Sequence, residues 1–169
     1  MSSAGRGLFR GLVRGAAAEA AGTTGLNAAT YLDMAVRGRG SSSAPQDIIE
    51  KTAGKVGVDI PGEGEARDNR LAGLGPLSGI TVGVVVGAIA GATKSMLNRR
   101  NGPTQLIATA LATGAAAMML ADAPMKALGV SDPADWRAQD WAADAIPHLL
   151  YGIVTAATLA ATEGGAGDQ

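Results

Sequence analysis

The stretch LAGLGPLSGITVGVVVGAIAGAT, residues 71–93, contains no Asp, Glu, Lys or Arg. Residues 101–121 and residues 145–162 share this property. A helix needs roughly 20 mostly apolar residues to cross the hydrocarbon core of a bilayer, which is about 30 Å thick. Each charge-free stretch is close to that length. We therefore expect three transmembrane helices, at about 71–97, 103–126 and 144–163.

The composition of the 169-residue chain supports this expectation. Only 17% of the residues are charged, against roughly 25% in an ordinary soluble domain. The net charge of -1 provides no positive field for a nucleic acid, and the absence of cysteine excludes disulfides and cysteine-ligated zinc. A soluble alanine-rich helical bundle is the remaining alternative.

Motifs of catalysis and cofactor binding are also missing from the sequence. It contains no nucleophile elbow, phosphate-binding loop, dinucleotide fingerprint or HExxH motif. We therefore expect no enzyme, no catalytic residue, no cofactor and no bound metal.

Residues 15–36 have the length of a fourth span but carry polar groups. Glu19, Asn27 and Asp33 are costly in lipid unless they face protein or water. The segment is either a bundle-facing span or a surface helix. Residues 1–14 precede it, with arginines every fourth position beside apolar residues, which is typical of a basic amphipathic helix at a membrane surface: Arg6, Arg10 and Arg14.

The remaining segments complete the predicted architecture. Residues 37–70 form a polar loop in which Pro45 begins a short helix, and residues 131–135 begin another that carries Trp136 and Trp141 at the membrane interface. Residues 165–169 are a tail. The predicted fold is an all-α, four-helix transmembrane bundle with short interfacial helices, in one membrane domain over 15–164.

The charges near the span ends predict the orientation. The segments on the side of the N-terminus are short, basic and nearly free of acids, whereas the opposite loops contain most of the Asp and Glu. We therefore expect a multi-pass protein of the cytoplasmic membrane with both termini in the cytoplasm.

Five glycines recur at a spacing of four through the second expected span, and on a helix they form one smooth groove. Such a groove allows another helix backbone to approach closely. It packs either the protein's own bundle, a second copy or another membrane protein. The glycines of this groove are Gly75, Gly79, Gly83, Gly87 and Gly91.

Ionisable and polar residues near the spans are candidates for a polar or proton site. Glu19 lies deepest; it is a candidate for a coupled proton, or it pairs with nearby Asn and Thr. Four others lie near the outer helix ends: Asp33, Asp122, Asp144 and His148. They form either a metal or proton site or ion pairs with arginine. The presence of a single histidine, directly after Pro147, counts against a metal. The candidates are Glu19, Asn27, Tyr31, Asp33, Arg37, Arg39, Asp122, Asp144 and His148.

Several runs carry a family resemblance: GTTGLNAATYLDM at 22–34, RGR at 37–39, LGVSDP at 128–133 and PHLLYG at 147–152. They resemble small multi-pass membrane proteins of high-GC actinobacteria and, more distantly, the YagU-like inner-membrane proteins. The resemblance implies an integral membrane protein and says nothing about its chemistry. It also draws attention to the polar residues within these runs and beside them.

Two functions are compatible with these patterns. The first is a structural or interaction subunit that uses its glycine groove within a homo-oligomer or a larger membrane complex. The alternative is a small ion- or proton-coupled transporter or channel that uses Glu19 and the Asp, His and Arg residues near the outer helix ends. In both cases the lipid bilayer is a partner and nucleic acid is not.

Overall fold

The computed structural model describes residues 2–97 and 102–164, and these contain helices and connecting loops but no strand. The predicted all-α fold is confirmed. The predicted tail, 165–169, and the residue preceding Ser2 lie outside the described residues. The helices are α1 (Ser3–Arg37), α2 (Ala44–Lys55), α3 (Gly64–Met96), α4 (Pro103–Ala127), the 3-10 turn η1 (Pro133–Asp135) and α5 (Ala138–Gly164).

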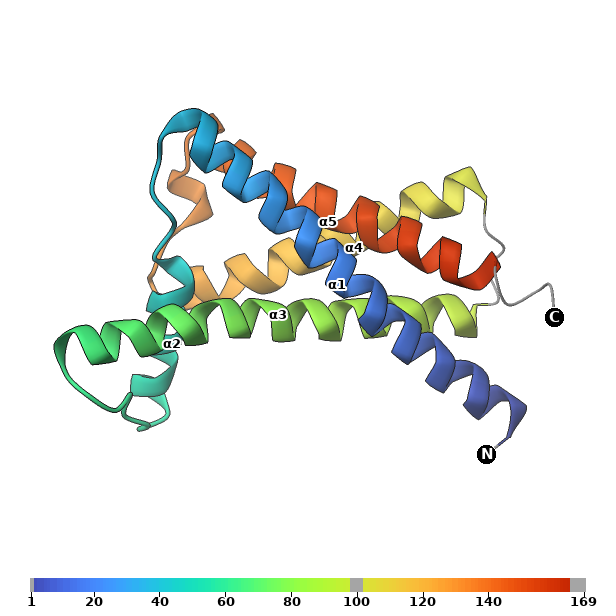
Figure 1. The fold of residues 1–169 in the computed structure, drawn as a ribbon, viewed down its shortest axis with the longest axis horizontal. Helices are drawn as coiled ribbons and strands as arrows, with labels where there is room; N and C mark the ends of the chain where they lie inside the picture. Colours follow the sequence, from blue (N-terminus) through green and yellow to red (C-terminus); the bar gives the residue numbers. More distant parts are fainter. Residues whose placement is uncertain (1, 98–101, 165–169) are drawn as a thin grey trace.

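Four long helices alternate in direction and form the body of the molecule. Figure 1 shows α1 crossing α3 obliquely, with α5 and α4 alongside. Helix α1 packs mainly against α3 and α5, and α4 packs mainly against α5. The start of α1 and the end of α5 lie at the same end of the bundle, on the right in Figure 1. We call this the terminal end, and the end that carries α2 and η1 the loop end.

Three helices extend beyond their predicted limits, and one of them, α5, begins at Ala138 instead of the expected residue 144. The expected entry helix 1–14 and the expected span 15–36 form the single helix α1. Helix α3 begins at Gly64, inside the expected loop 37–70, because its polar first turns are stabilised outside the apolar stretch. Arg67 pairs with Glu50 of α2 at 2.8 Å, and Arg70 donates to the Pro61 carbonyl at 2.9 Å.

The segment between α4 and α5 is a compact turn at the loop end. Asp132 accepts a hydrogen bond from the Ala134 N–H at 3.0 Å and pairs with Lys126 at 3.1 Å. These two partners hold the pKa of Asp132 below its ordinary value. The expected helix from residue 131 is only the turn η1, since Trp136 is extended and packs edge-on against Trp141, with ring centroids 5.2 Å apart.

Within the part of the chain that the structure describes, three helices are long and apolar enough to cross a membrane: α3, α4 and α5. In their most apolar windows only 22%, 22% and 33% of the residues are buried inside the molecule. A water-soluble bundle would bury these large side chains, whereas lipid solvates them. The chain therefore has the surface of a membrane protein. Helix α1 is not among the three. Its apolar residues are mostly alanine and glycine.

Candidate functional site

The glycine groove of α3 is filled by α1 of the same chain. A Cβ added at Gly11 would lie 2.6 Å from the carbonyl oxygen of Gly91, and one added at Gly87 would lie 2.5 Å from that of Gly15. These distances are too short for any side chain. The two backbones are therefore in direct contact, in the manner of small-xxx-small helix pairs.

The five glycines do not share one partner. A Cβ at Gly75 would lie 3.0 Å from Pro45 of α2, whereas one at Gly79 would meet nothing within 4 Å. The reason is geometric: residues four apart are displaced by about 40° on a helix, so the row turns by about 160° from Gly75 to Gly91. Only the last three glycines face α1.

Glu19 occupies the groove beside Gly83 and Gly87. The Glu19 Cδ lies 2.9 Å from the position of a Cβ at Gly83, and its Cβ lies 2.7 Å from that of a Cβ at Gly87. The residue is only 2% exposed. The Thr23 hydroxyl, one turn further along α1, donates a hydrogen bond to the Glu19 carboxylate. Because Gly83 is near the middle of the charge-free stretch 71–93, Glu19 lies deep in the apolar part of the bundle.

Tyr151 of α5 closes this site. Its side chain is 1% exposed, and its hydroxyl donates a hydrogen bond to the Gly83 carbonyl at 3.1 Å. It lies within electrostatic range of Glu19. The neighbouring Thr155 is fully buried and lies against Gly22 of α1. Helices α1, α3 and α5 therefore meet around one carboxyl group. We call this carboxyl group, together with Tyr151 and Thr155, the Glu19 site.

We expect Tyr151→Phe to lower the free energy of unfolding by about 1 kcal/mol, because it removes one interhelical hydrogen bond but keeps the ring. Tyr151→Ala should cost about 3–5 kcal/mol, because it also leaves a cavity. Titration with SDS in mixed micelles measures both values. Equal losses for the two variants would contradict a packing role for the ring.

The candidates at the loop end form two separate groups. Asp33 pairs with Arg37 at 3.4 Å and with Arg39 at 2.5 Å, both within the end of α1 and the following turn. Asp122, Asp144 and His148 form the second group, between α4 and α5. The structure thus separates Asp33 from the other three. Asp33 has arginine partners, and the other three ionisable residues lie together without it.

The Asp122–Asp144–His148 group, the outer cluster from here on, is partly buried. Asp122 is 9% exposed and lies within electrostatic range of Asp144 and His148. The His148 Nδ1 lies 2.9 Å from the Asp144 carbonyl and 3.4 Å from its carboxylate Oδ1. Helix α5 continues through Pro147, so Asp144 and His148 are aligned one turn apart despite the proline.

Two candidates from the resemblance lie away from both sites. Tyr31 is 63% exposed on α1, and Asn27 is half-buried between Glu19 and Asp33 along the same helix. Within the described ranges, no set of three His, Cys, Asp or Glu side chains is placed to hold a metal ion.

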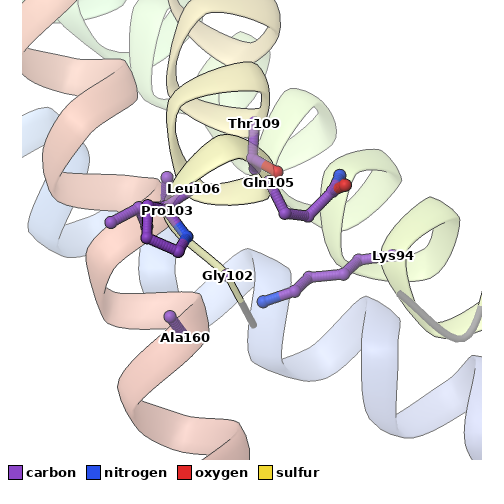
Figure 2. A pocket seen from close by; sticks show the side chains of 8 residues that line it. Lys94, Gly102, Pro103, Gln105, Leu106, Thr109 and Ala160 are labelled. Atoms are coloured by element: carbon purple, nitrogen blue, oxygen red, sulfur yellow. The ribbon is translucent and has the colours of Figure 1, made fainter. Parts of the chain in front are cut away.

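A cavity of about 290 Å³ lies at the terminal end, between the end of α3, the start of α4 and the end of α5. Lys94 reaches across it toward Gly102, with Gln105 above (Figure 2). Lys94 is buried, and Lys94, Gln105 and Ala160 each have interaction partners. The lining extends to Ala156, one residue along α5 from Thr155 of the Glu19 site.

Sequence reasoning missed the partners of the glycine groove. Gly7, Gly11 and Gly15 repeat the spacing of four on α1, which is a visible signal for a second small-residue face. A further close contact joins α4 and α5, where a Cβ at Gly114 would lie 2.7 Å from the His148 carbonyl. The interhelical role of Tyr151 has no signal in the sequence beyond its spacing, three residues after His148 and four before Thr155.

Comparison with known proteins adds no relative to this description. No protein-family model, no curated protein and no solved structure matches the chain. The resemblance to actinobacterial membrane proteins stays a prediction from the runs that carry it. The class of molecule is accordingly defined by its fold alone: a helical bundle with three apolar membrane-span candidates and a buried carboxyl group among its helices.

Proposed function

We propose that this protein moves protons across the cytoplasmic membrane, with Glu19 as the group that takes up and releases them. The observation that carries the proposal is the burial of Glu19 deep in the bundle, with a hydroxyl as its hydrogen-bond donor. Removing an ionised carboxylate from water is costly unless it is paired, and proton uptake removes that cost. An ionisable group at such depth is characteristic of proton relays.

Polar groups on either side of Glu19 supply routes for the proton. Toward the terminal end, the cavity lining reaches Ala156, beside Thr155. Toward the loop end, Asp144, His148, Tyr151 and Thr155 follow a four-three-four spacing and therefore lie on one face of α5. This stripe links the outer cluster to the Glu19 site. We infer that these groups carry the proton between the buried carboxyl group and the two ends of the bundle.

The proposal requires α1 to be the fourth membrane span. Its close contacts with α3 at Gly11 and Gly15, and with α5 at Gly22 and Gly25, support that role. Three of its four arginines lie at the terminal end and only Arg37 lies at the loop end, which favours a cytoplasmic location for both termini. The basic residues beside exposed apolar ones fit the headgroup region of the inner leaflet: Arg6, Arg10 and Arg14 beside Leu8, Phe9, Leu12 and Val13.

An interaction subunit that docks through the glycine groove is the less favoured function. Helix α1 already occupies the groove at Gly83, Gly87 and Gly91, and α2 covers Gly75. A partner would have to displace part of the same chain. A homo-oligomer that assembles through other apolar surfaces remains compatible with the proton-moving function.

Proton flux into liposomes tests the proposal. The purified protein is reconstituted with a pH-sensitive dye inside the vesicles, and a potassium diffusion potential drives protons inward. We expect acidification faster than in protein-free liposomes and dependent on Glu19. Flux equal to that of protein-free liposomes, with correctly folded protein, would refute it.

A further inference from the structure

The outer cluster contains two acceptor atoms that lack a donor. The Asp122 Oδ1 and the Asp144 Oδ2 are both buried, and neither has a hydrogen-bond partner. Asp122 itself is more than nine-tenths buried and carries this unpaired oxygen into the space between α4 and α5. An ionised carboxylate can only accept hydrogen bonds, and an unsatisfied buried acceptor is costly.

His148 does not supply the missing donor in its present arrangement. Its Nδ1 faces the Asp144 backbone carbonyl at 2.9 Å, and a carbonyl oxygen can only accept. A hydrogen bond between these two atoms requires the ring hydrogen on Nδ1, and that hydrogen then points at the backbone. In the neutral ring the other nitrogen, Nε2, is a further acceptor. The cluster thus has an excess of acceptors.

The neighbouring cations are engaged with other groups. On α4, Lys126 pairs with Asp132, and on α2, Lys51 donates to the carbonyls of Leu128 and Gly129 at 3.2 and 2.7 Å. Lys55 is exposed at the end of α2. The arginines at this end pair with acids of their own or with backbone carbonyls: Arg37 and Arg39 with Asp33, Arg67 with Glu50, Arg70 with Pro61 and Ala66, and Arg137 with Asp140. The acid–base groups that face one another in the cluster are accordingly Asp122, Asp144 and His148.

We propose that Asp122 and Asp144 bind one proton between them, with His148 as the neighbouring acid–base group, in a protonation site separate from the Glu19 site. One added hydrogen converts an unpaired acceptor into a donor. Two like charges in a poorly hydrated space favour the singly protonated pair, as in other carboxyl dyads. The absence of a three-residue metal-binding group among the described residues favours a proton over a metal ion as the ligand.

Infrared spectroscopy of the reconstituted full-length protein tests this site directly. A protonated carboxyl group has a C=O stretch that ionised carboxylates lack, and labelling with ¹³C-aspartate shifts this band for Asp but not for Glu. We expect a label-sensitive protonated band at pH 7 in the wild-type protein. Its absence would overturn the proposal, because both carboxylates would then be ionised and satisfied by water or a cation.

Variants locate the band. Asp122→Asn and Asp144→Asn should each abolish it, whereas the exposed Asp135→Asn should retain it, with helical content measured for all three. A band that survives in folded Asp122→Asn and Asp144→Asn proteins would also overturn the proposal. The wild-type measurement needs no variant to fold and reports no Glu signal. A failure here is therefore distinguishable from a failure of the Glu19 proposal, which liposome flux decides.

Discussion

Glu19→Gln should reduce proton flux into liposomes to the rate of protein-free vesicles. Glutamine keeps the shape and volume of the side chain, and its amide can still interact with the Thr23 hydroxyl, but it cannot take up or release a proton. The substitution also removes a charge from the interior, so the free energy of unfolding should stay unchanged or increase. The expected result is thus loss of transport by a protein that folds normally.

A matched control separates this effect from a general loss of acidic charge. Glu65 is exposed in the first turn of α3, outside the apolar stretch, and Glu65→Gln should retain wild-type flux. Glu19→Asp keeps the carboxyl group but withdraws it from Gly83, so we expect reduced but measurable flux. Undiminished flux in Glu19→Gln would exclude Glu19 as the proton carrier.

Gly87→Leu should destabilise the bundle by more than about 3 kcal/mol, the upper end of ordinary overpacking. Any side chain at this position meets the Gly15 carbonyl and the Glu19 Cβ, and the first of these is backbone. It can move only if α1 and α3 separate. The free energy of unfolding from SDS titration in mixed micelles measures the loss.

Gly79→Leu provides the control on the same helix and in the same row of glycines. A Cβ at Gly79 meets nothing within 4 Å, and leucine favours helix more than glycine does. We expect its free energy of unfolding to be unchanged or raised by up to about 1 kcal/mol. Equal destabilisation by both variants would contradict the described contact. Loss of a native complex in a stable Gly79→Leu protein would instead support docking through this face.

The helices were predictable from the sequence to the extent that charge marks their ends. The three charge-free stretches predict the apolar parts of α3, α4 and α5 nearly to their observed limits. The start of α3 was not predicted, because residues 64–70 are polar and helical at once, and hydropathy detects only the part of a helix that meets lipid. For the same reason hydropathy divides the single helix α1 into an entry segment and a span.

The Glu19 site was predictable only in parts. The sequence shows the glycine groove on α3 and the polar groups of residues 15–36 as separate features, since a pattern within one helix carries no information about its neighbour. The structure brings the two together: the groove accommodates the Glu19 side chain, and Tyr151 covers it. The matching face on α1, Gly11 and Gly15, shows the same spacing and would have suggested this pairing.

The contact between the α3 groove and Glu19 gives the glycines a role beyond close packing. Gly83 and Gly87 lack side chains where the carboxyl group and stem of Glu19 lie, so the groove makes room for an ionisable group that lipid would not accept. Stability of the α1–α3 pair and burial of Glu19 are therefore coupled. A bundle loosened at Gly87 should also hydrate Glu19.

The location of α1 decides whether Glu19 lies within the membrane, and single-cysteine labelling measures it. The chain has no native cysteine, and α1 lies between the exposed residues Ser2 and Ser41. The variants Ser2→Cys and Ser41→Cys are treated in intact cells with a membrane-impermeant maleimide, then again after permeabilisation. We predict labelling of Ser41→Cys in intact cells and of Ser2→Cys only after permeabilisation. Labelling of both from the same side would show that α1 does not cross the membrane and would contradict an intramembrane Glu19.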